Sequence, residues 1–168
     1  KRFQVFGAEK HRYKINRPIA DSRVTAFEAQ YGITLPSCYR AFISQVGSGG
    51  PGYRDSAVGP FYGIYRFGTC LDEAVENPAL CIHLQVVATP DMADEGWEAM
   101  ARRLKEDDSI SDQDYEAEAM RLYGGLMPIG SQGCEYFHAL AVTGEYAGRV
   151  VYLSQSISKP IFTYEANF

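Results

Sequence analysis

The sequence predicts an α+β domain in which N-terminal helices pack on a largely antiparallel sheet of about five or six strands. Apolar residues recur mostly at helical spacing up to residue 122, and beyond Leu126 their spacing changes to the period of two typical of strands. Helices followed by clustered strands favour this class over a doubly wound fold. The chain has 168 residues, of which 46% are apolar, so one domain with a packed core is expected.

Two helices are predicted near the start of the domain. Asp21 or Ser22 is a candidate N-cap for a helix over residues 22–31, which a glycine ends. Pro36 suits the first turn of the next helix, because it lacks only an amide that would be unpaired there. Residues 47–52 read Gly-Ser-Gly-Gly-Pro-Gly and favour turn geometry, so the second helix should end before them.

The middle of the chain is predicted to hold a short strand and two longer helices. Residues 59–67 have the aromatic and β-branched character that fits a pleated surface. The amphipathic stretch 92–122 is predicted to form two helices, with a break at the polar residues 107–109. Ser111 is the candidate N-cap of the second helix, because Asp114 follows three residues later in a pattern that resembles a capping box.

Strands are predicted to complete the sheet after these helices. The alternating segments are residues 126–129, 136–143, 149–153 and 160–164. The glycine-bounded loop at 144–148 is expected to join two of them as a hairpin.

Charge is distributed unevenly along the chain, whose net charge is −5. Residues 1–23 contain seven basic and two acidic residues, whereas residues 91–118 contain eleven acidic and three basic residues. Residues 1–20 are expected to form a basic arm or an edge strand, and residues 21–168 a single domain. The acidic lobe repels nucleic acid and favours a basic protein partner, which it would steer toward itself.

Several classes of protein are disfavoured by the sequence. No apolar run approaches the roughly 20 residues of a membrane helix, and the start shows no secretory signal, so a cytoplasmic protein is expected. The four cysteines are scattered, which favours reduced and mostly buried thiols; no metal site and no cofactor are predicted. Cys134 and His138 would share a strand face, yet they lie about 13 Å apart along it, so no catalytic residue is assigned.

Three motifs occur in order along the chain. The first joins Leu35-Pro36 to Tyr-Arg-Ala-Phe at 39–42 and Gly-Ser-Gly-Gly at 47–50. The second is Gly-Pro-Phe-Tyr-Gly-Ile at 59–64, and the third is Pro-Ile-Gly-Ser-Gln-Gly-Cys-Glu at 128–135 with the return strand at 148–152. Together they resemble the signature of the SUKH superfamily, which includes fungal cell-wall regulators of the Smi/Knr type and bacterial toxin-immunity proteins.

The resemblance implies a non-enzymatic protein-binding domain, an immunity protein that neutralises a cognate toxin, with a nuclease as one candidate. It leaves open a regulatory scaffold of the Smi/Knr type that binds signalling partners. A small cysteine hydrolase using Cys134 is a third alternative, from the residues alone.

The chain departs from the family pattern in two places. The segment between Ser48 and Gly59 is longer than the family's short glycine turn. The family also ends in an amphipathic helix, whereas this chain stops at Phe168 where that helix should begin, so a truncated C-terminal helix is expected.

The predicted contact residues are acids of the acidic lobe and two tyrosines in glycine-rich loops, because acids attract a basic partner and tyrosine anchors interfaces. They are Tyr53, Tyr146, Asp107, Asp108, Asp112, Asp114, Glu116 and Glu118. The sequence does not determine the oligomeric state.

Overall fold

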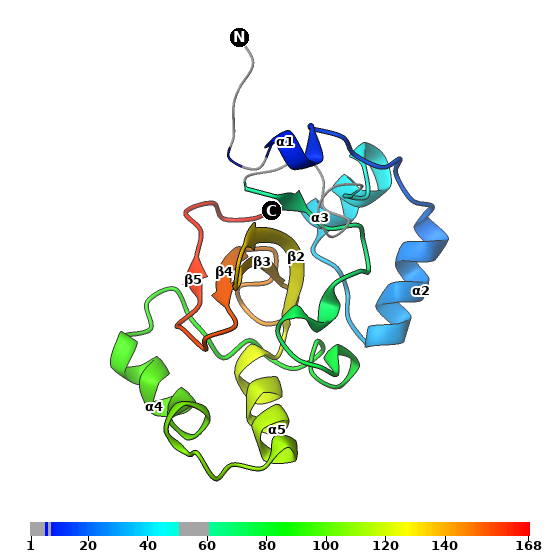
Figure 1. The fold of residues 1–168 in the computed structure, drawn as a ribbon. Helices are drawn as coiled ribbons and strands as arrows, with labels where there is room; N and C mark the ends of the chain where they lie inside the picture. Colours follow the sequence, from blue (N-terminus) through cyan, green and yellow to red (C-terminus); the bar gives the residue numbers. More distant parts are fainter. Residues whose placement is uncertain (1–5, 7, 51–60) are drawn as a thin grey trace.

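The computed structural model describes residues 6, 8–50 and 61–168 (Figure 1). Its helices and helical turns are α1 (Ala8–His11), α2 (Asp21–Tyr31), α3 (Ser37–Ala41), η1 (Phe42–Val46), η3 (Leu71–Glu73), η4 (Pro78–Leu80), α4 (Asp94–Glu106) and α5 (Asp112–Tyr123). Its strands are β1 (Gly63–Ile64), β2 (Leu126–Gly133), β3 (Tyr136–Ala141), β4 (Val150–Ser154) and β5 (Ile161–Phe162).

The strands form one sheet in the order β1-β2-β3-β4-β5, and every neighbouring pair is antiparallel. This meander confirms the predicted α+β class with an antiparallel sheet. The register of β2 against β3 shifts between Pro128 and Gly130 and again between Ser131 and Gly133, so β2 is irregular toward its end. Irregular pairing of this kind bends a strand and increases its twist.

Each face of the sheet packs against a different group of helices. On one face, Leu140 and Met127 pack in a cluster with Val24, Tyr39 and Ile43 of the N-terminal helices. On the other face, a cluster joins strand residues to α4 and α5 and includes Trp97, Leu122, Phe137, Val151 and Leu153. The Trp97 indole Nε1 donates a hydrogen bond to the Ile157 carbonyl at 3.0 Å, so α4 is fixed to the segment that follows β4.

The start of α2 differs from the prediction. The helix begins at Asp21, and its N-cap is Ala20, which makes no side-chain cap bond, so a cap by Asp21 or Ser22 is wrong. Both residues lie inside the first turn, where a carboxylate favourably opposes the helix dipole. Asp21 instead accepts a hydrogen bond from Arg40 Nη2 at 2.9 Å, which ties α2 to α3.

The break between α4 and α5 confirms the sequence prediction. Ser111 is the N-cap of α5, and its hydroxyl oxygen accepts a hydrogen bond from the Asp114 amide at 3.1 Å. In the turn before it, the Asp107 carboxylate accepts bonds from the amide and the hydroxyl of Ser109 at 3.0 and 2.6 Å. Those bonds, chiefly from the Ser109 hydroxyl, lower the pKa of Asp107.

The described part of the N-terminal segment contains the short helix α1, and residues 14–20 have no regular secondary structure. This segment packs on the glycine-rich turn, because the Asn16 amide donates to the Gly49 carbonyl at 3.0 Å. A Cβ at Gly49, whose φ is +77°, would lie 1.7 Å from the Tyr65 carbonyl oxygen. Glycine is therefore required where the turn passes the end of β1.

Candidate functional site: an acidic pocket

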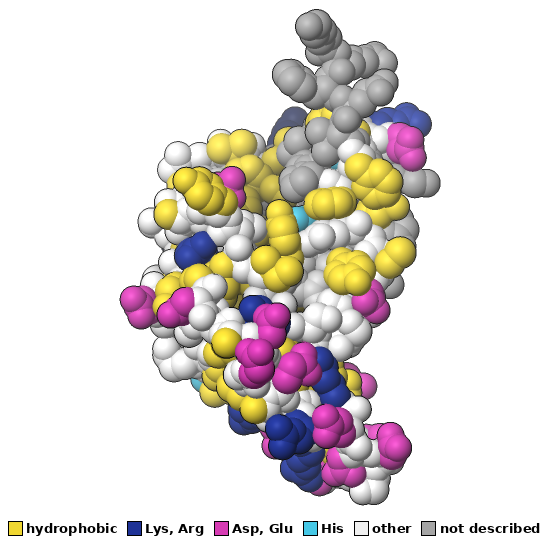
Figure 2. All heavy atoms as spheres, turned by 90° about the vertical axis from the view of Figure 1, so that its left-hand side faces the viewer, with side chains coloured by type: hydrophobic (Ala, Val, Ile, Leu, Met, Phe, Trp, Pro, Cys, Tyr) yellow, Lys and Arg dark blue, Asp and Glu magenta, His cyan; other side chains and the backbone are white. Residues whose placement is uncertain are grey.

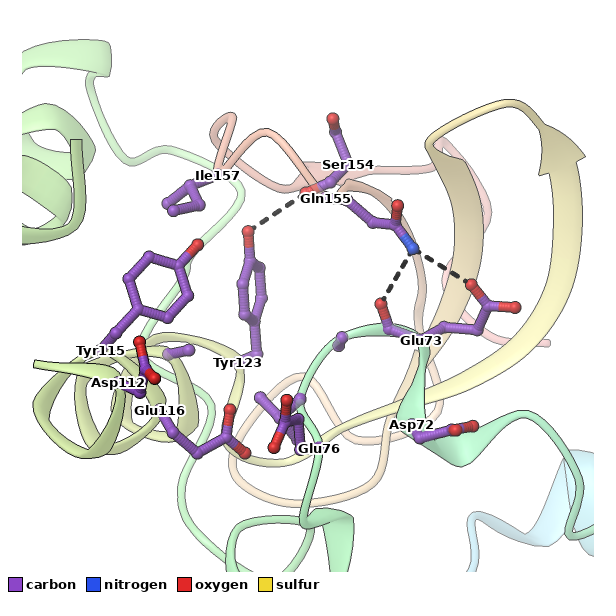
Figure 3. Close-up of a pocket in the computed structure, with 13 residues that line it drawn as sticks. Asp72, Glu73, Glu76, Asp112, Tyr115, Glu116, Tyr123, Ser154, Gln155 and Ile157 are labelled. Carbon is purple, nitrogen blue, oxygen red and sulfur yellow. Dashed lines mark hydrogen bonds between the residues drawn. The ribbon is translucent and has the colours of Figure 1, made fainter.

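A pocket of about 390 Å³ opens between α5, the segment around η3 and the chain that leaves β4 (Figure 3). Its lining residues are Asp72, Glu73, Ala74, Val75, Glu76, Asp112, Tyr115, Glu116, Ala119, Tyr123, Ser154, Gln155 and Ile157. Five of them carry carboxylates, and none of the described lining residues is Lys or Arg. The pocket therefore concentrates negative charge in a concave space, where it acts more strongly than on a flat surface.

The first wall is the segment around η3. Leu71 and Val75 are buried and anchor this segment, while Asp72, Glu73 and Glu76 line the pocket. Gln155 Nε2 donates to the carbonyl and the carboxylate of Glu73 at 3.5 and 3.3 Å, as Figure 3 shows. This contact connects the wall to the end of β4.

The second wall is one face of α5. Asp112, Tyr115, Glu116, Ala119 and Tyr123 follow at three- and four-residue steps, which places them on one side of a helix. The Asn77 amide donates to Glu116 Oε1 at 3.1 Å, and the Tyr123 hydroxyl donates to the Ser154 carbonyl at 3.2 Å. Both contacts hold α5 against the other pocket walls.

The negative charge of Glu116 in the pocket contributes to the pKa shift of a buried cysteine nearby. Burial, and secondarily the charge of Glu116, raises the pKa of the Cys81 thiol to about 11. Burial likewise raises the pKa of Tyr123, whose hydroxyl therefore stays protonated and keeps its bond to Ser154. The pocket can thus attract a cation and offers it several carboxylate oxygens as acceptors, while two tyrosine rings provide flat apolar walls.

Two of the predicted contact acids, Asp112 and Glu116, meet in the pocket. Asp114 and Glu118 lie elsewhere on α5 and pair with arginines. Arg103 Nη2 contacts Asp114 Oδ2 at 2.9 Å, and Arg103 Nη1 lies 3.6 Å from Glu118 Oε1. Arg121 Nε contacts Glu118 Oε2 at 2.8 Å. Of these four acids on α5, two therefore line the pocket and two pair with arginines.

The remaining predicted contact residues lie apart from the pocket lining. Asp107 and Asp108 are in the turn between α4 and α5, and Asp108 is exposed. Tyr146 is half-buried, with its ring centroid 5.4 Å from that of Phe162. Tyr53 lies outside the described residues.

The sequence reasoning missed the wall around η3. Asp72, Glu73 and Glu76 carry a local negative charge that is visible in the sequence, yet they lie before the acidic lobe that the charge count singled out. This wall contacts α5 through the Asn77 amide, which lies 39 positions before Glu116. It contacts the end of β4 through Glu73, which lies 82 positions before Gln155. No local pattern predicts such contacts.

The thiol predictions need one correction. Cys81 is buried and Cys38 and Cys70 are half-buried, but Cys134 is exposed. Its φ is +53°, and it lies in the turn before β3, so it does not share a strand face with His138 as expected. His138 Nε2 has no hydrogen-bond partner, and the two residues form no nucleophile–base pair in the described part of the chain.

Two further kinds of feature are absent from the described residues. No group of three or more His, Cys, Asp or Glu side chains there is arranged to hold a metal ion. Nor does any helix in those residues have the length and apolar character needed to cross a membrane.

Comparison with known proteins identifies the fold family. Neither the curated proteins nor the solved structures yield a match. The model of the SMI1/KNR4 family (SUKH-1) matches residues 18–168, nearly the whole chain. Membership supports a protein-binding role of the regulatory or immunity type in general. Members of the family are generally non-catalytic. The chain therefore belongs to the SMI1/KNR4 family.

Proposed function

We propose that this protein is an immunity protein that binds a basic toxin domain and neutralises it by covering its active surface. The observation that carries the proposal is the pocket, which five carboxylate-bearing residues line with no described Lys or Arg among them. A toxin that binds nucleic acid presents Lys and Arg to phosphates, and carboxylates can occupy the same positions.

The mechanism has two steps. The acidic half of the molecule first speeds encounter with a basic domain, because opposite charges steer diffusion. A Lys or Arg side chain of the toxin then enters the pocket, where Glu116 on α5 lies opposite Glu76 on the other wall (Figure 3). Asp114 and Glu118 contribute less, since Arg103 and Arg121 already pair with them.

Growth rescue tests the proposal. The C-terminal domain of the product of the adjacent gene is expressed in a test cell, with and without this protein. We expect the domain to stop growth and co-expression to restore it. A domain that kills in spite of co-expression contradicts the proposal, as does a harmless domain, and either result favours a regulatory scaffold instead.

A pair of double variants ties rescue to the pocket. Asp112→Asn with Glu116→Gln removes two charges from the pocket wall, and Asp114→Asn with Glu118→Gln removes two charges from the arginine-paired acids of the same helix. Rescue should be lost with the first and kept with the second. Equal rescue by both variants would show that the pocket is not the contact.

A further inference from the structure

The floor of the acidic pocket is apolar. Val75, Ala119 and Ile157 line the pocket and are 6%, 5% and 7% exposed. The Tyr123 ring lines it as well, and its hydroxyl donates to the Ser154 carbonyl at 3.2 Å, so the ring is held in place. A charged group that enters the pocket must therefore give up water on the side that meets this floor.

The rim of the pocket, in contrast, is acidic. Asp72, Glu76 and Asp112 are exposed, and Glu116 is half-buried opposite Glu76 (Figure 3). Two carboxylates on opposite walls repel each other, and a cation that lies between them relieves the repulsion. On the outer surface of α4 and α5, acidic side chains lie beside Lys and Arg (Figure 2). The described lining of the pocket offers its acids no such neighbour.

An accessible aromatic ring borders the same space. Tyr115 lines the pocket and is 38% exposed. Figure 3 shows Tyr115 and Tyr123 pointing from α5 toward the segment that holds Ser154 and Ile157. The face of an aromatic ring attracts a cation, and the flat guanidinium group of arginine also stacks on it. The ring thus points to a cationic ligand independently of the acids.

Floor, rim and ring together favour one kind of cation. The acids belong to no group of described side chains that could hold a metal ion. The ammonium group of lysine is compact and strongly hydrated, so an apolar floor suits it poorly. A guanidinium group is planar and weakly hydrated, and its edge carries five N–H donors, so it can meet a ring and two carboxylates at once. About 390 Å³ also leaves room for the stem of a long side chain.

We infer that the pocket selects arginine over lysine and takes one arginine side chain of the partner. The edge of the guanidinium group donates to Glu76 and Glu116, and its face lies against the Tyr115 ring. The apolar stem of the arginine covers Ala119 and Ile157. This inference rests on the proposed function, since it specifies the side chain that the toxin inserts.

NMR titration of the purified full chain tests the selectivity without any toxin. The two probes are N-acetyl-arginine amide and N-acetyl-lysine amide, which carry the same charge at the end of an apolar stem. We expect the arginine probe to shift the backbone amide signals of α5 at millimolar concentration. It should bind about 2- to 5-fold more tightly than the lysine probe, which is the range of one cation–π contact near a surface.

Variants of the exposed ring assign this difference to its aromatic face. Tyr115→Leu keeps an apolar side chain without that face, so the arginine probe should bind it no better than the lysine probe. Tyr115→Phe keeps the face and should keep the selectivity. The matched control is Tyr164→Leu, because Tyr164 is 99% exposed and lies outside the pocket lining. Glu76→Gln, at an exposed position, should weaken both probes alike.

The outcomes separate this inference from the proposed function. Equal binding of the two probes overturns the selectivity and leaves the proposed function standing, because a lysine of the toxin would then serve equally well. Absence of binding by both probes overturns the inference too, and growth rescue then decides whether the protein neutralises a toxin through another surface. Selective binding of the arginine probe without growth rescue would contradict the proposed function alone.

Discussion

The acidic pocket and the surroundings of His138 both draw on β4, yet their chemistry is opposite. Ser154 lines the pocket, among five carboxylates, whereas the Tyr152 ring lies 5.1 Å from the ring of His138, which burial keeps neutral at pH 7. Charge attracts a partner before contact, while apolar surface contributes only once water has left it. The difference teaches that one strand can contribute to a charged pocket at its end and to an uncharged, closely packed environment at its middle.

The neutrality of buried His138 gives the largest expected effect. An unfolded histidine has a pKa of about 6.5, whereas burial lowers that of folded His138 to about 4. Between these values only the unfolded chain binds the proton. The free energy of unfolding is therefore undiminished above about pH 6.5 and falls as the pH drops toward 4, by up to ~3 kcal/mol from this group.

Urea unfolding at several pH values measures this loss. His138→Phe keeps a ring of similar size and should remove most of the histidine-dependent fall between pH 6.5 and 4. The control is His83→Gln, because His83 is exposed, and it should leave the fall unchanged. If His138→Phe and the unchanged chain lose stability in parallel, the ring is protonated in the folded state and burial does not keep it neutral.

Removing two negative charges from the pocket wall tests whether the pocket binds the basic partner. Asp112→Asn with Glu116→Gln should weaken binding of the basic toxin domain by about 10- to 100-fold, because a Lys or Arg in the pocket loses two acceptors. Titration calorimetry with the purified domain measures this. The isosteric pair Asp114→Asn with Glu118→Gln carries the same change in net charge and should weaken binding about 3-fold at most. Equal losses would mean that net charge, not the pocket, decides affinity.

Local signals in the sequence were sufficient for some of these features. The break between α4 and α5 and the Ser111 cap follow from residues within a few positions of each other, so the sequence predicts them correctly. The α+β class and the antiparallel sheet likewise follow from the change of period and are confirmed.

The rest depends on contacts that no local pattern contains. The sequence singles out only Asp112 and Glu116 among the five pocket acids, and the opposite wall is missed because Glu73 meets Gln155 from 82 positions away. The equal spacing of Asp112, Asp114, Glu116 and Glu118 also conceals that Arg103, on the preceding helix, neutralises two of them. The alternating pattern of strand residues predicts that Cys134 shares a face with His138. Cys134 instead lies in the turn before β3, where that alternation does not apply.

Removing the N-cap of α5, which forms one wall of the pocket, should have a smaller effect on stability. Ser111→Ala removes the bond to the Asp114 amide and should lower the free energy of unfolding by about 1 kcal/mol. It should also loosen the first turn, which carries Asp112. Ser22→Ala is the control, because Ser22 lies in the first turn of α2 without capping it. Thermal unfolding followed by circular dichroism measures both, and an equal loss would remove the special role of Ser111.

The smallest effect distinguishes the two groups of acids on α5. Arg103 pairs with Asp114 and Glu118, and its side chain is half exposed, so Arg103→Ala should lower the free energy of unfolding by only about 0.5–1 kcal/mol. The loss should shrink in high salt, because salt screens exposed pairs. Arg102→Ala is the control, since Arg102 is exposed and makes no ion pair with the described residues. Both variants remove one positive charge, but only Arg103→Ala frees the Asp114 carboxylate, while Glu118 keeps its contact with Arg121. Stopped-flow association with the toxin domain should therefore be slightly faster for Arg103→Ala than for Arg102→Ala, and equal rates would mean that the paired acids were never neutralised.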